Sequence, residues 1–420
     1  MKYFFIISIT FFCSISISAQ TVTTFVGGCS ELYHGFLDAT GTAARFYYPT
    51  AITVDTHGTF YVADSGNNVI RKITPNGVVT TLAGSGSNQP SGVAVDTTGN
   101  VYISDTFNNR ILKINFGSNV AHTIAGSGTA GNADGIGIAA EFNTPKGIAV
   151  DINGNLFVAD TYNNRIRKID TNGLVTTIAG SSAGNSNGFG ASAQFALPCG
   201  VALDLAGNLF VADTGNNLIK KIGTDGMVST YIGNGIGGDT DGIGPNASLN
   251  RPISLAIDSN NVIYFVSKNE NLIRRVTPAG EVTTIAGYYE TWGSCSNGIG
   301  TNAQFLHPEG LVINPTGNIY IADTGSHTIR KISNLLSTNE NQIENQIEFF
   351  PNPATDNITF HFADITNSTI TILDMNGRVL QKNSISENNT TIDISNLSKG
   401  FYLIQIATNK GFISKKIIKE

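Results

Sequence analysis

Residues 145–180 read PKGIAVDINGNLFVADTYNNRIRKIDTNGLVTTIAG, and versions of this phrase occur six times along the 420-residue chain. The copies open at six prolines: Pro49, Pro90, Pro145, Pro198, Pro252 and Pro308. A fixed period of this size indicates one supersecondary unit that is stacked many times. The repeat therefore sets the fold class before any single residue is considered.

Each copy predicts four short strands joined by tight turns. In the copy quoted above, β-prone runs at 147–151, 155–160, 165–170 and 174–180 alternate with Asn-Gly and Asn-Asn turns. Four such strands form an antiparallel meander, and radial repetition of meanders gives a β-propeller. Small residues at alternate positions of the first run, Gly147 and Ala149, suit a strand near the central axis because side chains alternate between sheet faces.

The two ends of the repeat region indicate how the ring closes. Copies one to five each end in a fourth strand, whereas the sixth copy stops at Ser333 without one. The missing run stands at the other end, where residues 22–27 read VTTFVG. We expect an all-β, six-bladed β-propeller over residues 20–333, in which strand 22–27 pairs with blade six and covers its exposed edge.

The wording VADxxNNRIRKI…VTTIAG resembles the NHL repeat, a propeller-forming family. The resemblance covers about residues 22–333 and rests on all six copies. Related six-bladed propellers include zinc-dependent amidating lyases and calcium-dependent lactonases, so the resemblance leaves both binding and enzymatic functions open.

The first residues read as a targeting segment. Met1-Lys2-Tyr3 precedes an apolar run at 4–17 and the small residues Ser18-Ala19. This pattern is typical of a secretory signal peptide spanning 1–19. The run is too short for a membrane span, and no other stretch approaches ~20 continuous apolar residues. We expect an exported chain without a transmembrane span.

The composition changes after Ser333. Residues 334–346 are polar and read as a linker. Residues 347–420 alternate strands with Asn-Gly and Lys-Gly turns, which predicts a small immunoglobulin-like β-sandwich. The blocks PNPA (351–354), DMNGRV (374–379) and LSKGFYL (397–403) resemble the type A C-terminal sorting domain of the bacterial type IX secretion system. The resemblance implies the type IX machinery as a partner, with a secreted or outer-membrane surface location.

Charge argues against nucleic acid as a partner. Lys and Arg number 25 against 31 Asp and Glu, and charged residues make up 13% of the chain, whereas nucleic-acid binders normally carry a basic patch. The third strand of five copies holds a basic pair, which we expect at a solvated outer rim, with polyanion binding as the alternative. These pairs are Arg71-Lys72, Arg167-Lys168, Lys220-Lys221, Arg274-Arg275 and Arg330-Lys331.

Candidate ligand contacts lie on the face that carries the second-to-third-strand turns, since loops on a rigid scaffold carry function. Five blade-to-blade connections place an Asp or Asn eight residues before an apolar anchor, and the acidic members are Asp38, Asp134 and Asp241. These side chains are interpreted as turn-fixing, because Asx residues bond nearby backbone N–H groups, with a ligand or cation contact as the alternative. Lys146 and Glu309 begin inner strands and are expected to line the central mouth.

Blade five departs from the repeat. In the other five copies the second strand ends in Asp, at Asp64, Asp105, Asp160, Asp213 and Asp323. Recurrence in equivalent positions indicates turn-fixing acids rather than catalytic ones. Blade five instead reads SKNEN at 267–271, so Lys268 and Glu270 are either local drift or part of a ligand-facing loop.

A catalytic metal site needs about three converging ligands. His34, His307 and His327 are the histidines expected on one face near blade six, and they keep a metal site as a minor alternative. We expect no metal, cofactor or catalytic residue. The favoured function is a binding module for an extracellular protein or glycan, and the alternative is a secreted hydrolase or lyase acting at the central mouth.

Cys29 and Cys295 follow fourth strands of blades that should be neighbours at the closure. They are candidates for a disulfide, which an oxidising compartment permits. Cys199 is expected to stay free.

Overall fold

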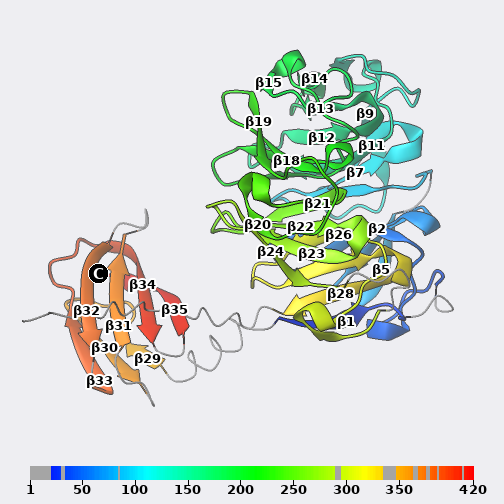
Figure 1. The fold of residues 1–420 in the computed structure, drawn as a ribbon. Helices are drawn as coiled ribbons and strands as arrows, with labels where there is room; N and C mark the ends of the chain where they lie inside the picture. The colour runs from blue at the N-terminus through cyan, green and yellow to red at the C-terminus, as the bar shows by residue number, and fades with distance from the viewer. Residues whose placement is uncertain are drawn as a thin grey trace, which may run out of the picture. The chain divides into compact units, whose positions relative to one another are not determined.

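The computed structural model describes residues 20–29, 34–83, 86–288, 295–333, 347–362, 368–374, 379–385, 387–408 and 411–420. They belong to two compact units, one within 20–334 and one that contains 335–420 (Figure 1). The signal peptide expected at 1–19 and the linker expected at 334–346 lie outside the described residues.

The first unit consists of six antiparallel sheets, one for each copy of the repeat. Each sheet runs from an inner to an outer strand. The inner-to-outer strands of blades one to three are β2 (Pro49–Val54), β3 (Phe60–Asp64), β4 (Val69–Ile73), β5 (Val79–Ala83); β6 (Gly92–Val95), β7 (Val101–Asp105), β8 (Arg110–Ile114), β9 (Ala121–Ala125); and β11 (Pro145–Val150), β12 (Leu156–Asp160), β13 (Arg165–Ile169), β14 (Leu174–Ala179). Those of blades four to six are β16 (Val201–Leu203), β17 (Leu209–Asp213), β18 (Leu218–Ile222), β19 (Met227–Ile232); β21 (Pro252–Ile257), β22 (Ile263–Ser267), β23 (Leu272–Val276), β24 (Glu281–Ala286); and β26 (Pro308–Ile313), β27 (Ile319–Asp323), β28 (Thr328–Ser333), β1 (Thr21–Val26).

Short elements complete the blades. Two-residue strands add to the outer edge of four sheets: β10 (Gly135–Ile136), β15 (Gly188–Phe189), β20 (Gly242–Ile243) and β25 (Gly298–Ile299). A 3-10 turn joins the second and third strands of every blade: η3 (Ser65–Asn67), η4 (Thr106–Asn108), η6 (Thr161–Asn163), η8 (Thr214–Asn216), η10 (Lys268–Glu270) and η12 (Thr324–Ser326). The connections contain η2 (Gly41–Ala43), η5 (Gly137–Ala139), η7 (Gly190–Ser192), η9 (Gly244–Asn246) and η11 (Gly300–Asn302).

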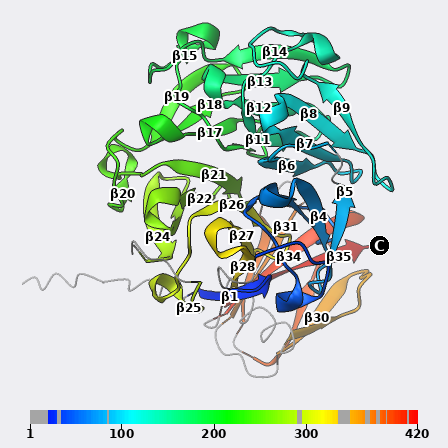
Figure 2. The same cartoon turned by 90° about the vertical axis from the view of Figure 1, so that its right-hand side faces the viewer.

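The inner strands form a closed ring. Contacts run in the cyclic order β2, β6, β11, β16, β21, β26 and back to β2. Figure 2 shows β6, β11, β21 and β26 near the middle, with β9, β14, β19 and β24 at the periphery. Neighbouring inner strands approach closely at glycine: a Cβ on Gly147 would lie 2.2 Å from the carbonyl oxygen of Cys199. The all-β propeller fold predicted from the repeat is confirmed.

The N-terminal strand β1 is the outer strand of blade six. It pairs antiparallel with β28, with Val22 opposite Ile332 and Thr23 opposite Lys331, and also with β25. Val22 and Val26 are fully buried. Figure 1 shows β1 beside β28, so the two chain ends of this unit meet within one sheet.

The core consists of apolar layers between adjacent blades. The anchors of the five long connections are fully buried within these layers: Phe46, Phe142, Phe195, Leu249 and Phe305. A fully buried aromatic side chain contributes about 2–3 kcal/mol. Each anchor therefore fixes the path of a long connection over its blade.

The C-terminal unit is a sandwich of two antiparallel sheets. One sheet has the order β29 (Ile347–Phe350), β30 (Asn357–Phe362), β33 (Asn389–Asp393). The other has the order β32 (Val379–Ile385), β31 (Ser368–Leu373), β34 (Gly400–Thr408), β35 (Gly411–Lys419). Phe360 of the first sheet and Ile370 and Ile404 of the second share one buried core.

Candidate functional site

The candidate site is the mouth of the central channel, on the face that carries the 3-10 turns. The channel has a volume of about 300 Å³ and is lined by the six inner strands. The second residue of each copy stands at its mouth: Thr50, Ser91, Lys146, Cys199, Ile253 and Glu309. Lys146 and Glu309 therefore lie where the sequence places them, and six different side chains meet there.

A second cavity of about 310 Å³ adjoins the mouth at the junction of blades five, six and one. It is lined by Tyr48, Lys268, His307, Glu309, Thr324 and Gly325. The Lys268 ammonium forms an ion pair with the Glu309 carboxylate, and the side chains are 30% and 19% exposed. The structure thus brings together two of the residues singled out in the sequence. Tyr48 was missed, although it directly precedes the opening proline of its copy, and His307 was considered only as part of a metal site.

The position of Lys268 follows from the repeat. In the other five blades this position is Ser or Thr, and its hydroxyl donates to the carbonyl of the next blade's opening proline. Thr324 of blade six, for example, donates to the Pro49 carbonyl over 2.7 Å. At the blade five–six junction the ion pair of Lys268 with Glu309 stands in place of this bond.

A second repeated bond joins neighbouring blades. The residue that follows each 3-10 turn adopts a left-handed conformation, and in five blades it is Asn, whose side-chain oxygen accepts a backbone N–H from the next blade. In blade six this residue is His327, whose Nδ1 accepts the N–H of Tyr48 over 3.0 Å. The imidazole must be unprotonated at Nδ1 to accept this bond.

The histidines do not converge as a metal site would require. The rings of His34 and His327 are 5.3 Å apart, while His307 lines the cavity beside Lys268. Burial, with a smaller effect of His34, lowers the pKa of His327 to about 4. Among the residues that the structure describes, no group of three His, Cys, Asp or Glu is arranged to hold a metal ion.

The acids of the long connections are bonded to their own blades. Asp134 accepts hydrogen bonds from Arg167 (2.8 Å) and from the Thr177 hydroxyl (2.9 Å) and backbone N–H (3.1 Å). Asp38 and Asp241 repeat these contacts in blades one and five. Burial opposes ionisation, but the bonds from Thr177 and Arg167 outweigh it and lower the pKa of Asp134. These carboxylates hold the connection against strands three and four of the blade.

The prediction that the basic pairs lie at a solvated rim is wrong for the first member of each pair. Arg71, Arg167, Lys220, Arg274 and Arg330 are completely buried. The Arg167 guanidinium stacks over Phe142 at 5.1 Å, donates to the carbonyls of Ala133 and Glu141, and bonds Asp160 over 2.7 Å. The recurrence of Asp seven residues before each buried Arg, except in blade five, is the sequence signal for this pairing.

The strand-ending acids fix the turns, as predicted. Asp160 is fully buried and accepts the backbone N–H of Asn143 (2.7 Å) and the Asn163 amide (2.8 Å). Burial raises the pKa of Asp160, against the lowering effect of these bonds and of Arg167. The turns on the mouth face are therefore held by the same internal network in most blades.

Blade five changes this network. Ser267 replaces the strand-ending acid, and Glu270 occupies the position of the turn Asn. Glu270 is only 4% exposed and accepts a hydrogen bond from the Asn250 amide over 2.9 Å. Burial and, to a lesser extent, Asp239 raise its pKa. Glu270 is therefore buried within the loop, whereas Lys268 is partly exposed and Asn269 is exposed.

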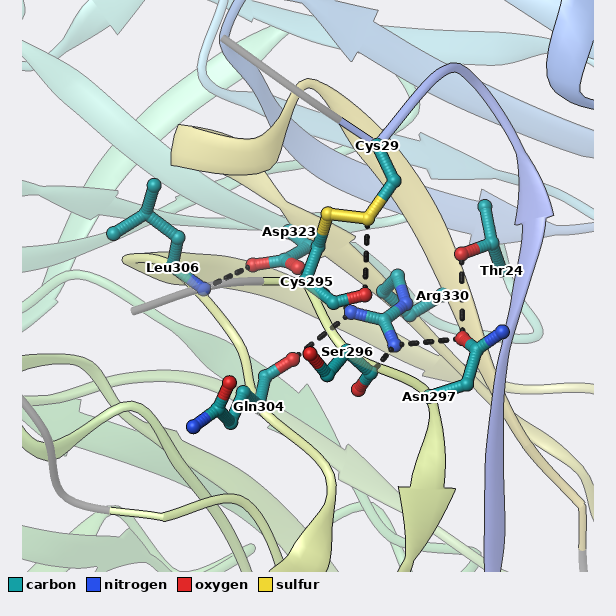
Figure 3. Close-up of a disulfide and its surroundings, with 9 residues drawn as sticks. All are labelled: Thr24, Cys29, Cys295, Ser296, Asn297, Gln304, Leu306, Asp323 and Arg330. Carbon is teal, nitrogen blue, oxygen red and sulfur yellow. Dashed lines mark hydrogen bonds and ion pairs between the residues drawn. A yellow bond between two sulfur atoms is a disulfide. The ribbon is translucent and has the colours of Figure 1, made fainter. Parts of the chain in front are cut away.

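A disulfide joins Cys29 and Cys295, whose Cα atoms are 5.9 Å apart (Figure 3). It connects the segment after β1 to the connection that precedes β26. Figure 3 shows it beside Arg330, which bonds Asn297 and the Ser296 carbonyl. Cys199 is free and buried.

Family models match both units. The model of the secretion system C-terminal sorting domain matches residues 348–420. The NHL repeat model matches residues 46–73, 88–114 and 305–332, and the teneurin NHL domain model matches 127–188.

Individual relatives and solved structures agree with these matches. NHL repeat-containing protein 2 of Bos taurus is 28% identical over 301 residues, covering 49% of this chain and 41% of that protein. The chain thus matches about two fifths of that relative's length. A structural genomics protein of unknown function from Bacteroides thetaiotaomicron VPI-5482 has a TM-score of 0.60 at 20% identity, over 75% of this chain and 76% of that one. An auxiliary nutrient binding protein from the same organism has a TM-score of 0.60 at 18% identity, with the same coverage.

The chain is a β-propeller protein built from NHL repeats. Its C-terminal unit is a type IX secretion system sorting domain, which directs it to the cell surface or the extracellular space. No helix in the described part of the chain is long and apolar enough to cross a membrane.

Proposed function

We propose that the propeller is an extracellular binding module, exported through its sorting domain, that holds a protein or glycan partner at the channel mouth. One observation carries the proposal. Residues that maintain the fold recur from blade to blade, whereas the six mouth positions differ in every blade, from Thr50 and Ser91 to Lys146 and Glu309. Different side chains that meet at one concave surface of a repeated scaffold are typical of ligand recognition.

The charges at the mouth support binding. No hydrogen bond or ion pair is present at the Lys146 ammonium among the described residues, and its side chain is half-buried in the channel wall. The likeness to an auxiliary nutrient binding protein is in keeping with such a role, although at 18% identity it concerns the fold alone. The alternative, a hydrolase or lyase at the mouth, would require a nucleophile with a base or a set of metal ligands. The mouth hydroxyls of Thr50 and Ser91 are hydrogen-bonded to Ser65 and Thr106, and the Cys199 thiol to the Leu197 carbonyl.

The test is a binding comparison between mouth and rim variants. The full-length chain is immobilised and exposed to a polysaccharide panel and to the secreted and surface proteins of the producing cell. We expect Lys146→Ala and Glu309→Gln to weaken capture of the ligand. Lys168→Ala and Glu281→Gln, on outer strands, are the matched controls and should bind as the unchanged chain does. Equal binding by all four variants would contradict the proposal.

A further inference from the structure

The junction of blades five, six and one carries a coordinated departure from the repeat. Lys268 stands where the other blades have Ser or Thr, and Glu309 stands where blades one and two have Thr50 and Ser91. The two replacements form an ion pair with each other. Hydroxyl groups join the other blades without any charge, so the junction does not require an ion pair for closure.

The ion pair opens into the 310 Å³ cavity beside Tyr48. Tyr48 is 46% exposed, and its ring packs edge-on against His327 with centroids 4.6 Å apart. Its backbone has φ of 50° and is tied to His327 Nδ1. The aromatic ring is therefore held in place at the cavity wall before any ligand arrives, which reduces the entropy cost of binding.

The chemistry of this cavity suits a sugar ring. Lys268 offers N–H donors and Glu309 offers acceptor oxygens, so neighbouring hydroxyls of one sugar can accept from the first and donate to the second. An exposed tyrosine presents an apolar face for the C–H groups of a pyranose and a polar end for its hydroxyls. Because the two charges compensate each other, the site favours an uncharged ligand.

We propose that this cavity is a subsite for one uncharged pyranose residue of a glycan. The inference rests on the proposed binding function and names its ligand class. A peptide would instead require an apolar side-chain pocket or an unpaired strand edge. The six lining residues include no aliphatic side chain, and they come from turns and strand starts rather than from an unpaired strand edge.

The test is affinity electrophoresis of the full-length chain in gels that contain laminarin, xyloglucan, mannan or dextran, with polygalacturonate as the acidic probe. We expect at least one neutral polysaccharide to retard the chain. Tyr48→Ala and Lys268→Thr should each weaken that binding about tenfold, as loss of one aromatic or charged contact implies. Lys268→Thr introduces the residue that four of the other blades use here, so its melting temperature should not fall. Tyr162→Ala, which removes a ring 58% exposed outside both cavities, should leave binding unchanged.

Three results of the electrophoresis would overturn the sugar subsite. They are the absence of retardation by every neutral polysaccharide, unchanged binding by both Tyr48→Ala and Lys268→Thr, and salt-sensitive binding of polygalacturonate alone that is lost in Lys146→Ala. A protein partner captured by the unchanged chain but not by Glu309→Gln would also overturn it, while the binding module would stand. Neutral polysaccharide binding that no mouth variant affects would refute both.

Discussion

The buried arginines give a quantitative prediction, because blade two lacks one. Leu112, 3% exposed, occupies the position of Arg71 and Arg167, yet its blade still contains the buried Asp105. There the carboxylate is paired with Arg110, two residues earlier on the same strand, over 2.7 Å. Blade three has an arginine at that earlier position, Arg165, whereas blade one has a valine.

Arg71→Leu and Arg167→Leu should therefore differ in cost. In Arg71→Leu the fully buried Asp64 loses the one cation that pairs with it among the described residues, bonded at 2.9 Å, and Val69 stands where blade two has Arg110. Removing one partner of a buried pair costs about 3–5 kcal/mol. In Arg167→Leu the side chain of Arg165 can turn to Asp160, as Arg110 does to Asp105, so we expect a loss of about 1–3 kcal/mol.

Urea unfolding followed by circular dichroism measures both variants. Adding Val69→Arg to Arg71→Leu should recover at least half of the lost free energy, and adding Arg165→Val to Arg167→Leu should raise its cost to that of Arg71→Leu. The loss should also shrink at lower pH, because a buried carboxyl with a raised pKa then folds as the neutral acid. Equal costs for the two single variants, or no effect of Val69→Arg, would refute the reasoning.

Three further predictions concern the closure and the tail. His327 has a folded pKa of about 4 against 6.5 unfolded, so its contribution to stability is present above pH 6.5 and is lost as the pH falls towards 4, by up to about 3 kcal/mol. The difference in melting temperature between the unchanged chain and His327→Asn, which carries the repeat's usual residue, should shrink as the pH falls. A difference that stays constant with pH would contradict the prediction. Deleting residues 21–27 should lower the melting temperature and produce oligomers in light scattering, because β28 then has an open edge; a monomer of unchanged stability would argue against it. Truncation after Ser333 should leave a folded propeller in the periplasm, detected by cell fractionation, and normal appearance of that product outside the cell would exclude an export role for the tail.

Much of the fold could be predicted from the sequence because the repeat reports it six times. The turns, the inner-strand glycines and the terminal run at 22–27 each carry a local signal that does not depend on distant residues. The buried arginines could not be found in this way. Composition places arginine on surfaces, and only the joint presence of Phe142, Asp160 and Asp134 around one guanidinium makes its burial favourable.

The candidate site was predicted in part. Lys146 and Glu309 follow from their place in the repeat alone, because the second residue of each copy lies where the inner strand begins, at the mouth. The pairing of Lys268 with Glu309 depends on the contact between two successive blades, which a repeat pattern does not resolve. Glu270 shows the same limit: its place in the loop is clear from the sequence, but its burial against Asn250 is not.

The disulfide has a consequence for transport in addition to its effect on stability. Cys29 and Cys295 are 266 positions apart in the sequence. The bond between them closes the intervening chain into one covalent loop, which contains most of the blades. A linear chain passes a pore as a single thread, but a circle passes only as two strands side by side or as a folded body. An oxidising compartment lets the bond form before the last membrane is crossed. We therefore expect the export channel to carry this propeller across as a folded domain.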